Sequence, residues 1–226
     1  MRTRSGERSF SRVSASAFLA VVLTLVPVRA QVATSLPHLQ KQGSATQLIV
    51  HNSPFLMLAG ELGNSSASDE RYMEPVWGTL QTMRVNTVLM PVYWELIEPQ
   101  EGAFDFTLVD HLIGTARGKG LKIVVLWFGT WKNSMSCYAP LWVKTDQKRF
   151  PRARLDNGKP VEILTPFSNE NVSADARAFT AFMKHLRAID ATHNTVVMVQ
   201  VENEIGMIPQ ARDHSAEAEN AFAQQV

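Results

Sequence analysis

The sequence has a single cysteine in 226 residues, which removes several classes of protein at once. Cys137 can form no disulfide within this chain, so the protein is not a disulfide-stapled scaffold. No motif places a general base beside it, and we interpret it as a buried or idle thiol. The six histidines include no closely spaced pair of ligands, so neither a metal site nor another cofactor is expected.

The sequence also lacks a glycine-rich phosphate loop, internal repeats and low-complexity segments. The formal net charge is +1, and removing the leader described below leaves 17 basic and 20 acidic residues. Such a balance provides no basic patch for nucleic acid or anionic lipid. Hydrophobic residues make up 45% of the chain and charged residues 19%, as in globular domains. A neutral partner such as a carbohydrate is compatible with this composition.

The first 30 residues have the layout of a secretory signal peptide. Four arginines within residues 2–12 precede an apolar run at 18–26, and Val-Arg-Ala at 28–30 puts small residues before a cleavage site. A membrane anchor is the alternative, but the apolar run is short for a span and Pro27 interrupts its end. We expect cleavage after Ala30, export to the periplasm or medium, and no membrane attachment afterwards.

Residues 31–46 are polar and mixed, and we expect a flexible lead-in there. Two short apolar runs, 48–50 and 55–58, flank a turn and predict a hairpin. The second run continues into Ala59-Gly60-Glu61, which we expect to form the first strand of a larger sheet. Residues 47–226 are predicted to form one catalytic domain.

Strands and helices alternate from there on. The expected elements are a helix around 76–83 with Pro75 in its first turn, a strand at 87–94, a helix at 108–116, a strand at 121–127, a long loop at 128–172, a helix at 173–189 capped by Ser173, and a strand at 195–201. This alternation predicts a parallel sheet with right-handed crossovers. Polar residues follow the strand ends, as in a (β/α)8 TIM barrel. The α/β chain would supply about the first four β/α units of such a barrel, truncated before closure.

Two carboxyl groups and an amide follow the last of these strands, in Gln200-Val201-Glu202-Asn203-Glu204-Ile205-Gly206. Glycoside hydrolysis needs a pair of carboxyl groups, one of which protonates the leaving oxygen. The pKa of that acid must be raised if it is to work near neutral pH. An adjacent amide can hold a sugar hydroxyl while the acid acts on the bond.

The segment QVENEIG at 200–206 is similar to the QVENE-Y-G segment of glycoside hydrolase family 35, the β-galactosidases. Residues 93–106 resemble a W-x-x-x-E-P-x-x-G-x-F-D-F stretch shared by families 35 and 42 of clan A. This resemblance implies a retaining β-galactosidase in which Glu204 is the acid/base, Asn203 binds the sugar ring and Glu202 has a supporting role. It also implies that the nucleophile follows a seventh strand, beyond this chain, so we expect the chain alone to be inactive.

The sequence departs from the family pattern at two positions. Thr130, within Phe-Gly-Thr-Trp, stands where many members have a Glu that contacts galactose, and Pro91 stands where a sugar-contacting Tyr is expected. We expect Glu95, Trp131 or Lys132-Asn133 to replace these contacts, and we nominate Trp94 and Glu61 as further substrate-binding residues. The tryptophans could equally be core residues.

Three functional hypotheses remain open. The chain could belong to a β-galactosidase acting on terminal β-galactosides of oligo- or polysaccharides, to a related clan A β-glycosidase of other specificity, or to an inactive truncated or sugar-binding product. The oligomeric state is not predicted.

Overall fold

The computed structural model describes Met1 and residues 35–133, 135–207 and 210–224. Apart from Met1, the predicted signal peptide lies outside these residues. The described residues from Ser35 onward belong to one unit, which is described below. In this part of the chain no helix is long and apolar enough to cross a membrane.

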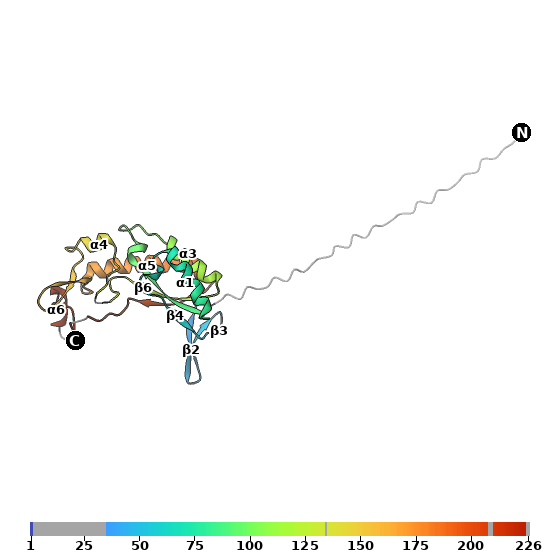
Figure 1. Cartoon of the computed structure of the whole chain (residues 1–226), viewed down its shortest axis with the longest axis horizontal. Helices are drawn as coiled ribbons and strands as arrows, with labels where there is room; N and C mark the ends of the chain where they lie inside the picture. Colours follow the sequence, from blue (N-terminus) through green and yellow to red (C-terminus); the bar gives the residue numbers. More distant parts are fainter. Residues whose placement is uncertain (2–34, 134, 208–209, 225–226) are drawn as a thin grey trace. The chain divides into compact units, whose positions relative to one another are not determined.

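A parallel sheet of four strands forms the centre of the fold (Figure 1). The strands are β4 (Ala59–Glu61), β5 (Thr87–Tyr93), β6 (Lys122–Phe128) and β9 (Val196–Val201), and they lie side by side in chain order. An order without reversal is that of a barrel wall rather than of a doubly wound sheet. β6 is apolar throughout after Lys122 because both of its faces are buried. The predicted parallel α/β architecture is confirmed.

Three amphipathic helices lie on one side of this sheet: α1 (Glu70–Thr82), α3 (Thr107–Gly118) and α5 (Asn169–Asp190) (Figure 1). Each presents an apolar stripe to the strands. The stripe of α5 packs on the sheet through Phe182, whose ring stacks 5.8 Å from that of Trp127 in β6. The predicted helices are therefore confirmed, with corrections at two of their starts.

The N-terminal ends of α1 and α5 lie earlier than predicted. The Asp69 carboxylate accepts hydrogen bonds from the backbone of Arg71 and Tyr72. This cap begins α1 at Glu70, five residues before Pro75, and leaves that proline inside the helix. Ser168 rather than Ser173 caps α5, through its hydroxyl and the N–H of Asn171. In both cases a capping residue lies further upstream than expected and begins the helix earlier.

The expectation of a flexible lead-in is wrong for residues 38–46. β1 (His38–Gln42) and β2 (Ala45–Val50) form an antiparallel ribbon, joined through Gly43 with φ +61°. All five side chains of β1 are exposed, so no apolar alternation marks it as a strand. A hairpin is confirmed at this place, but β2 pairs with the short strand β3 (Ser53–Pro54), which was predicted as turn, and the run 55–58 is not a strand.

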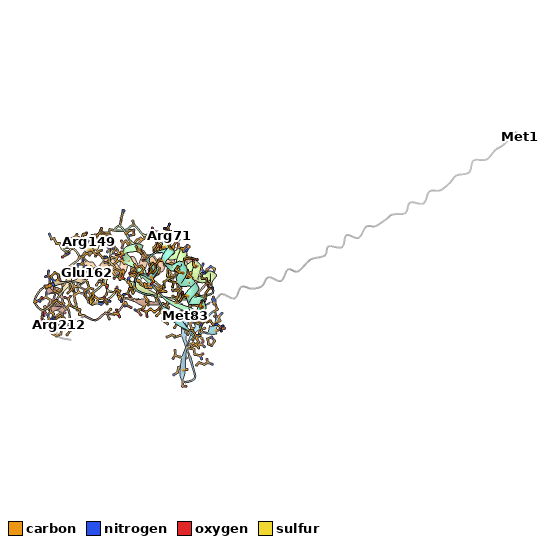
Figure 2. All side chains as sticks on the ribbon, viewed as in Figure 1. Met1, Arg71, Met83, Arg149, Glu162 and Arg212 are labelled. Atoms are coloured by element: carbon orange, nitrogen blue, oxygen red, sulfur yellow. The ribbon has the colours of Figure 1, made fainter. Side chains whose placement is uncertain are left out.

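The stretch 128–172 is not a single loop. It contains α4 (Leu141–Thr145) and an antiparallel hairpin of β7 (Arg152–Arg154) and β8 (Pro160–Leu164). This hairpin packs Ala153 and Ile163 against Trp131 in a small second core. The remaining short elements are η1 (Ser66–Ser68), α2 (Trp94–Ile97) and α6 (Ala216–Phe222). α4 and α6 lie at the same end of the domain, near the labelled Arg212 and away from Met83 (Figure 2).

Candidate active site

The chain segments that follow β6 and β9 are joined at the carboxyl end of the sheet. The Trp131 N–H donates to Oε2 of Glu202 over 2.8 Å, and the Asn203 N–H donates to the Trp131 carbonyl over 3.3 Å. The Asn203 amide nitrogen donates to the Lys132 carbonyl, and the Trp131 indole donates to the Glu204 carbonyl. These bonds hold the turn that contains Glu204 against the segment that follows β6.

Glu204 is the exposed carboxylate of this junction. Its side chain is 63% exposed, and Oε2 lies 2.9 Å from Nζ of Lys132, whose side chain is only 6% exposed. The bond and charge of Lys132, with a smaller contribution from Asn133, hold the pKa of Glu204 below its ordinary value. The backbone has φ +42°, a region that L residues adopt mainly at turns and functional sites. Glu204 is therefore in its charged form at neutral pH.

Glu202 has the opposite environment. It is partly buried, and burial together with a hydrogen bond to Asp175 raises its pKa to about 10. Its own backbone also has a positive φ, +61°. Two carboxyls separated by one residue therefore differ in protonation because one faces Lys132 in the open and the other is buried beside an acid.

Asp175 is the functional candidate that the sequence reading missed. It lies in the second turn of α5, is 7% exposed, and accepts hydrogen bonds from Trp127 Nε1 and the Thr130 N–H. A helix that begins at Ser173, as the sequence predicts, would put Asp175 in its first turn, where the helix dipole favours an acid. Its spacing in the sequence could have indicated a buried position. Asp175 precedes Phe179 and Phe182 by four and seven residues and so shares their buried face of the helix.

A cavity of 440 Å³ lies beside Asp175 and Glu202. Its walls are mostly apolar and come from the end of β6, from α5 and from the residues around the end of β9. The lining residues are Trp127, Thr130, Trp131, Pro166, Val172, Asp175, Ala176, Phe179, Val201, Glu202 and Ile205. The Thr130 hydroxyl is buried without a hydrogen-bond partner among the described residues. This hydroxyl is therefore an unpaired polar group in a mostly apolar wall.

The other nominated residues are distributed over separate contacts. Trp131 is 6% exposed and Trp94 is fully buried, with its indole N–H donating to Oε2 of Glu98. The other oxygen of Glu98 accepts the Gly102 N–H, so Trp94 supports the turn after α2. Glu95 pairs with Lys144 of α4 over 2.8 Å, and Glu61 ends β4 with its side chain exposed. The structure thus brings Glu204, Asn203 and Trp131 together after β6 and β9. Glu95 instead forms an ion pair with Lys144 of α4.

Comparison with known proteins identifies related glycoside hydrolases. A model of glycoside hydrolase family 42, described as "Beta-galactosidase", matches residues 66–226. A β-galactosidase of Xanthomonas manihotis is 27% identical over 213 residues, which are 89% of this chain and 31% of that protein. The chain therefore spans about a third of the length of this curated relative.

Two solved structures resemble the fold at 17% identity. The β-galactosidase of the psychrophilic Marinomonas ef1 has a TM-score of 0.59 over 74% of this chain and 24% of its own. The exo-β-1,4-mannosidase Op5Man5 of Opitutaceae bacterium strain TAV5 has a TM-score of 0.50 over 70% of this chain and 26% of its own. Both neighbours are TIM-barrel glycosidases, so the parallel sheet and helices match part of a barrel.

Proposed function

Because the chain belongs to the glycoside hydrolase family of β-galactosidases whose model matches residues 66–226, we propose that it carries the acid/base part of a retaining β-galactosidase site. The substrate would be a terminal β-galactoside of an oligo- or polysaccharide. The observation that carries this proposal is the placement of Glu204, an exposed carboxylate after β9 with its backbone fixed by the segment after β6. The carboxyl ends of the strands are where TIM-barrel enzymes build their active sites.

Glu204 would act in both steps of the reaction. In the first, its protonated carboxyl gives a proton to the glycosidic oxygen as the bond from that oxygen to the anomeric carbon breaks and a second carboxylate attacks the carbon. In the second step, the Glu204 carboxylate takes a proton from the water that releases the sugar. The second carboxylate is assigned to none of the described residues, since Glu202 is held by Trp131 and Asp175.

Lys132 favours the base form of Glu204, whereas the first step needs the acid. A sugar that covers the exposed carboxylate removes water from it, and this desolvation raises its pKa. We propose that substrate binding thereby returns the proton to Glu204, while Lys132 stabilises the carboxylate left after proton donation. Asn203 would contact the sugar, because its side-chain nitrogen uses one hydrogen on the Lys132 carbonyl and has a second one to donate.

The substrate proposal is tested with the complete protein and a panel of nitrophenyl β-glycosides that includes galactoside, glucoside, mannoside and fucoside. We expect kcat/KM to be highest for the galactoside. A clear preference for another sugar would refute the galactosidase assignment while leaving the role of Glu204 to its own test. No hydrolysis of any member would refute the enzymatic proposal as a whole.

We also propose that the protein is exported, on the basis of the basic segment, apolar run and Val-Arg-Ala site within residues 1–30. N-terminal sequencing of the protein from the periplasm or medium should begin at Gln31. A mature chain that still begins within the first ten residues would refute cleavage after Ala30.

A further inference from the structure

Glu202 and Asp175 form a pair of carboxyls at the wall of the apolar cavity. Glu202 follows β9 and Asp175 belongs to α5, and the two carboxyls accept the consecutive N–H groups of Trp131 and Thr130 and line the same cavity. Two ionised carboxylates so placed repel each other and cannot hydrogen-bond, because each has only acceptor oxygens. A proton on one of the two groups removes this repulsion and lets that group donate to the other.

The surrounding donors decide which group carries it. Oδ1 of Asp175 accepts the Trp127 indole N–H over 2.8 Å, and Oδ2 accepts the Thr130 backbone N–H. Both Asp175 oxygens are thus used as acceptors, and a proton on either would compete with an N–H donor. Oε2 of Glu202 accepts the Trp131 N–H, which leaves Oε1 of Glu202 for the proton.

We propose that Glu202 is a neutral acid that donates a hydrogen bond to the Asp175 carboxylate, and that this pair is a positioning device for Glu204. The positioning role rests on the proposed acid/base function of Glu204, whereas the location of the proton does not.

The path from the pair to Glu204 is short. Asp175 holds the Thr130 N–H and Glu202 holds the Trp131 N–H, so the pair fixes two consecutive peptides after β6. From this segment, the Trp131 indole donates to the Glu204 carbonyl and Lys132 donates to its carboxylate. Glu202 itself lies two residues before Glu204. Loss of the shared proton would therefore displace both groups that hold Glu204, the Trp131 indole and the Lys132 ammonium.

The electrostatic environment agrees with this assignment. Asp175 is the charged group that acts on Glu202, while the nearby cation Lys132 is paired with Glu204. The other neighbours are backbone N–H groups and the apolar cavity wall. Deprotonation of Glu202 would place two negative charges together in this setting, and burial and Asp175 accordingly raise its pKa to about 10.

Two isosteric variants of the complete protein distinguish this proposal from a merely structural contact. Glu202→Gln keeps an acceptor for the Trp131 N–H and supplies an N–H for Asp175, so it replaces the acid without a titratable proton. We expect kcat/KM at neutral pH to stay within about threefold of the parent value. Asp175→Asn has one acceptor for two N–H donors, and we expect kcat to fall about ten- to a hundredfold with KM changed less.

Infrared spectroscopy locates the proton independently of activity. At pH 7 the parent protein should show a carboxylic acid carbonyl band that Glu202→Gln lacks, while Glu219→Gln, a change at an exposed carboxyl, should retain it. Absence of this band from the parent, or its retention in Glu202→Gln, would overturn the assignment. A loss of kcat in Glu202→Gln as large as in Asp175→Asn would overturn the positioning role. If no variant or parent hydrolyses a glycoside, the proposed function fails and the band still decides the location of the proton.

Discussion

The ammonium group of Lys132 lies 2.9 Å from a carboxylate oxygen of Glu204 and is the main cause of the lowered pKa of that glutamate. The pair joins the segments that follow β6 and β9. A lysine in this place stabilises the base form of the residue that we propose as the acid/base. Removing the cation should therefore change the titration of Glu204 more than its position.

Lys132→Met should raise the pKa of Glu204 towards that of an ordinary glutamate, because the methionine keeps the length of the side chain but neither donates nor carries charge. The titration can be followed by carbon NMR of the glutamate carboxyls, with the Glu204 signal identified by its absence from Glu204→Gln. Lys144→Met is the matched control, because Lys144 pairs with Glu95. An unchanged Glu204 titration in Lys132→Met would contradict the ion pair.

The raised pKa of Glu202 predicts how stability depends on pH. A carboxyl whose pKa is about 10 in the folded state and 4.5 in the unfolded state leaves the folded protein with more bound protons between these values. Its contribution to the free energy of unfolding is therefore full below pH 4.5 and declines as pH rises towards 10, by at most about 1.4 kcal/mol per pH unit.

Denaturant unfolding between pH 5 and 9 measures this decline. The parent protein should lose stability with rising pH more steeply than Glu202→Gln, which has no proton to lose. Glu101→Gln is the control, because Arg149 lowers the pKa of Glu101 and its titration lies below this window. Equal slopes for the parent and Glu202→Gln would show that the folded state does not hold the Glu202 proton.

Gly129 tests how tightly Asp175 is held. A Cβ at this position would collide with the Asp175 carboxylate and lie 2.5 Å from Trp127 Nε1. Gly129→Ala should therefore lower the free energy of unfolding by about 1–3 kcal/mol, as overpacking in a core does. Gly114→Ala in α3 is the matched control, because nothing lies within 4 Å of its Cβ and alanine favours a helix. If both variants melt at the parent temperature, the packing around Asp175 is looser than described.

The strands β5 and β6 were predictable from sequence because burial on both faces leaves a largely apolar run. β9 begins with an apolar run as well, although only its first two residues are buried. β5, β6 and β9 each lie within one or two residues of the expected bounds, since the interior dictates which side chains fit. The position of Glu204 was also predictable in outline, because polar residues that directly follow an apolar barrel strand lie at the end of the barrel that holds the active site. The strand order then followed from the alternation of strands and helices.

The parts that could not be predicted depend on contacts between distant segments. The β1 strand exposes every side chain, and the β7–β8 hairpin is short and charged, so neither has a hydrophobic period. Asp175 became a site candidate only when α5 placed it against Trp127 and the Glu202 turn. The pairing of Lys132 with Glu204 likewise joins residues 72 positions apart. Local patterns contain no information on such pairings.

The most direct test of the central claim is the leaving-group dependence of Glu204→Gln in the complete protein. Glutamine keeps the shape of the side chain but cannot transfer a proton, an effect typically worth about 10²–10⁴ in rate. We predict a large loss of kcat/KM on galactosides with poor leaving groups and a much smaller loss on dinitrophenyl galactoside, which needs little protonation. Azide should also accelerate turnover of that activated substrate. An equal loss on all substrates, or the leaving-group pattern in Glu202→Gln instead, would contradict the assignment of Glu204 as the acid/base.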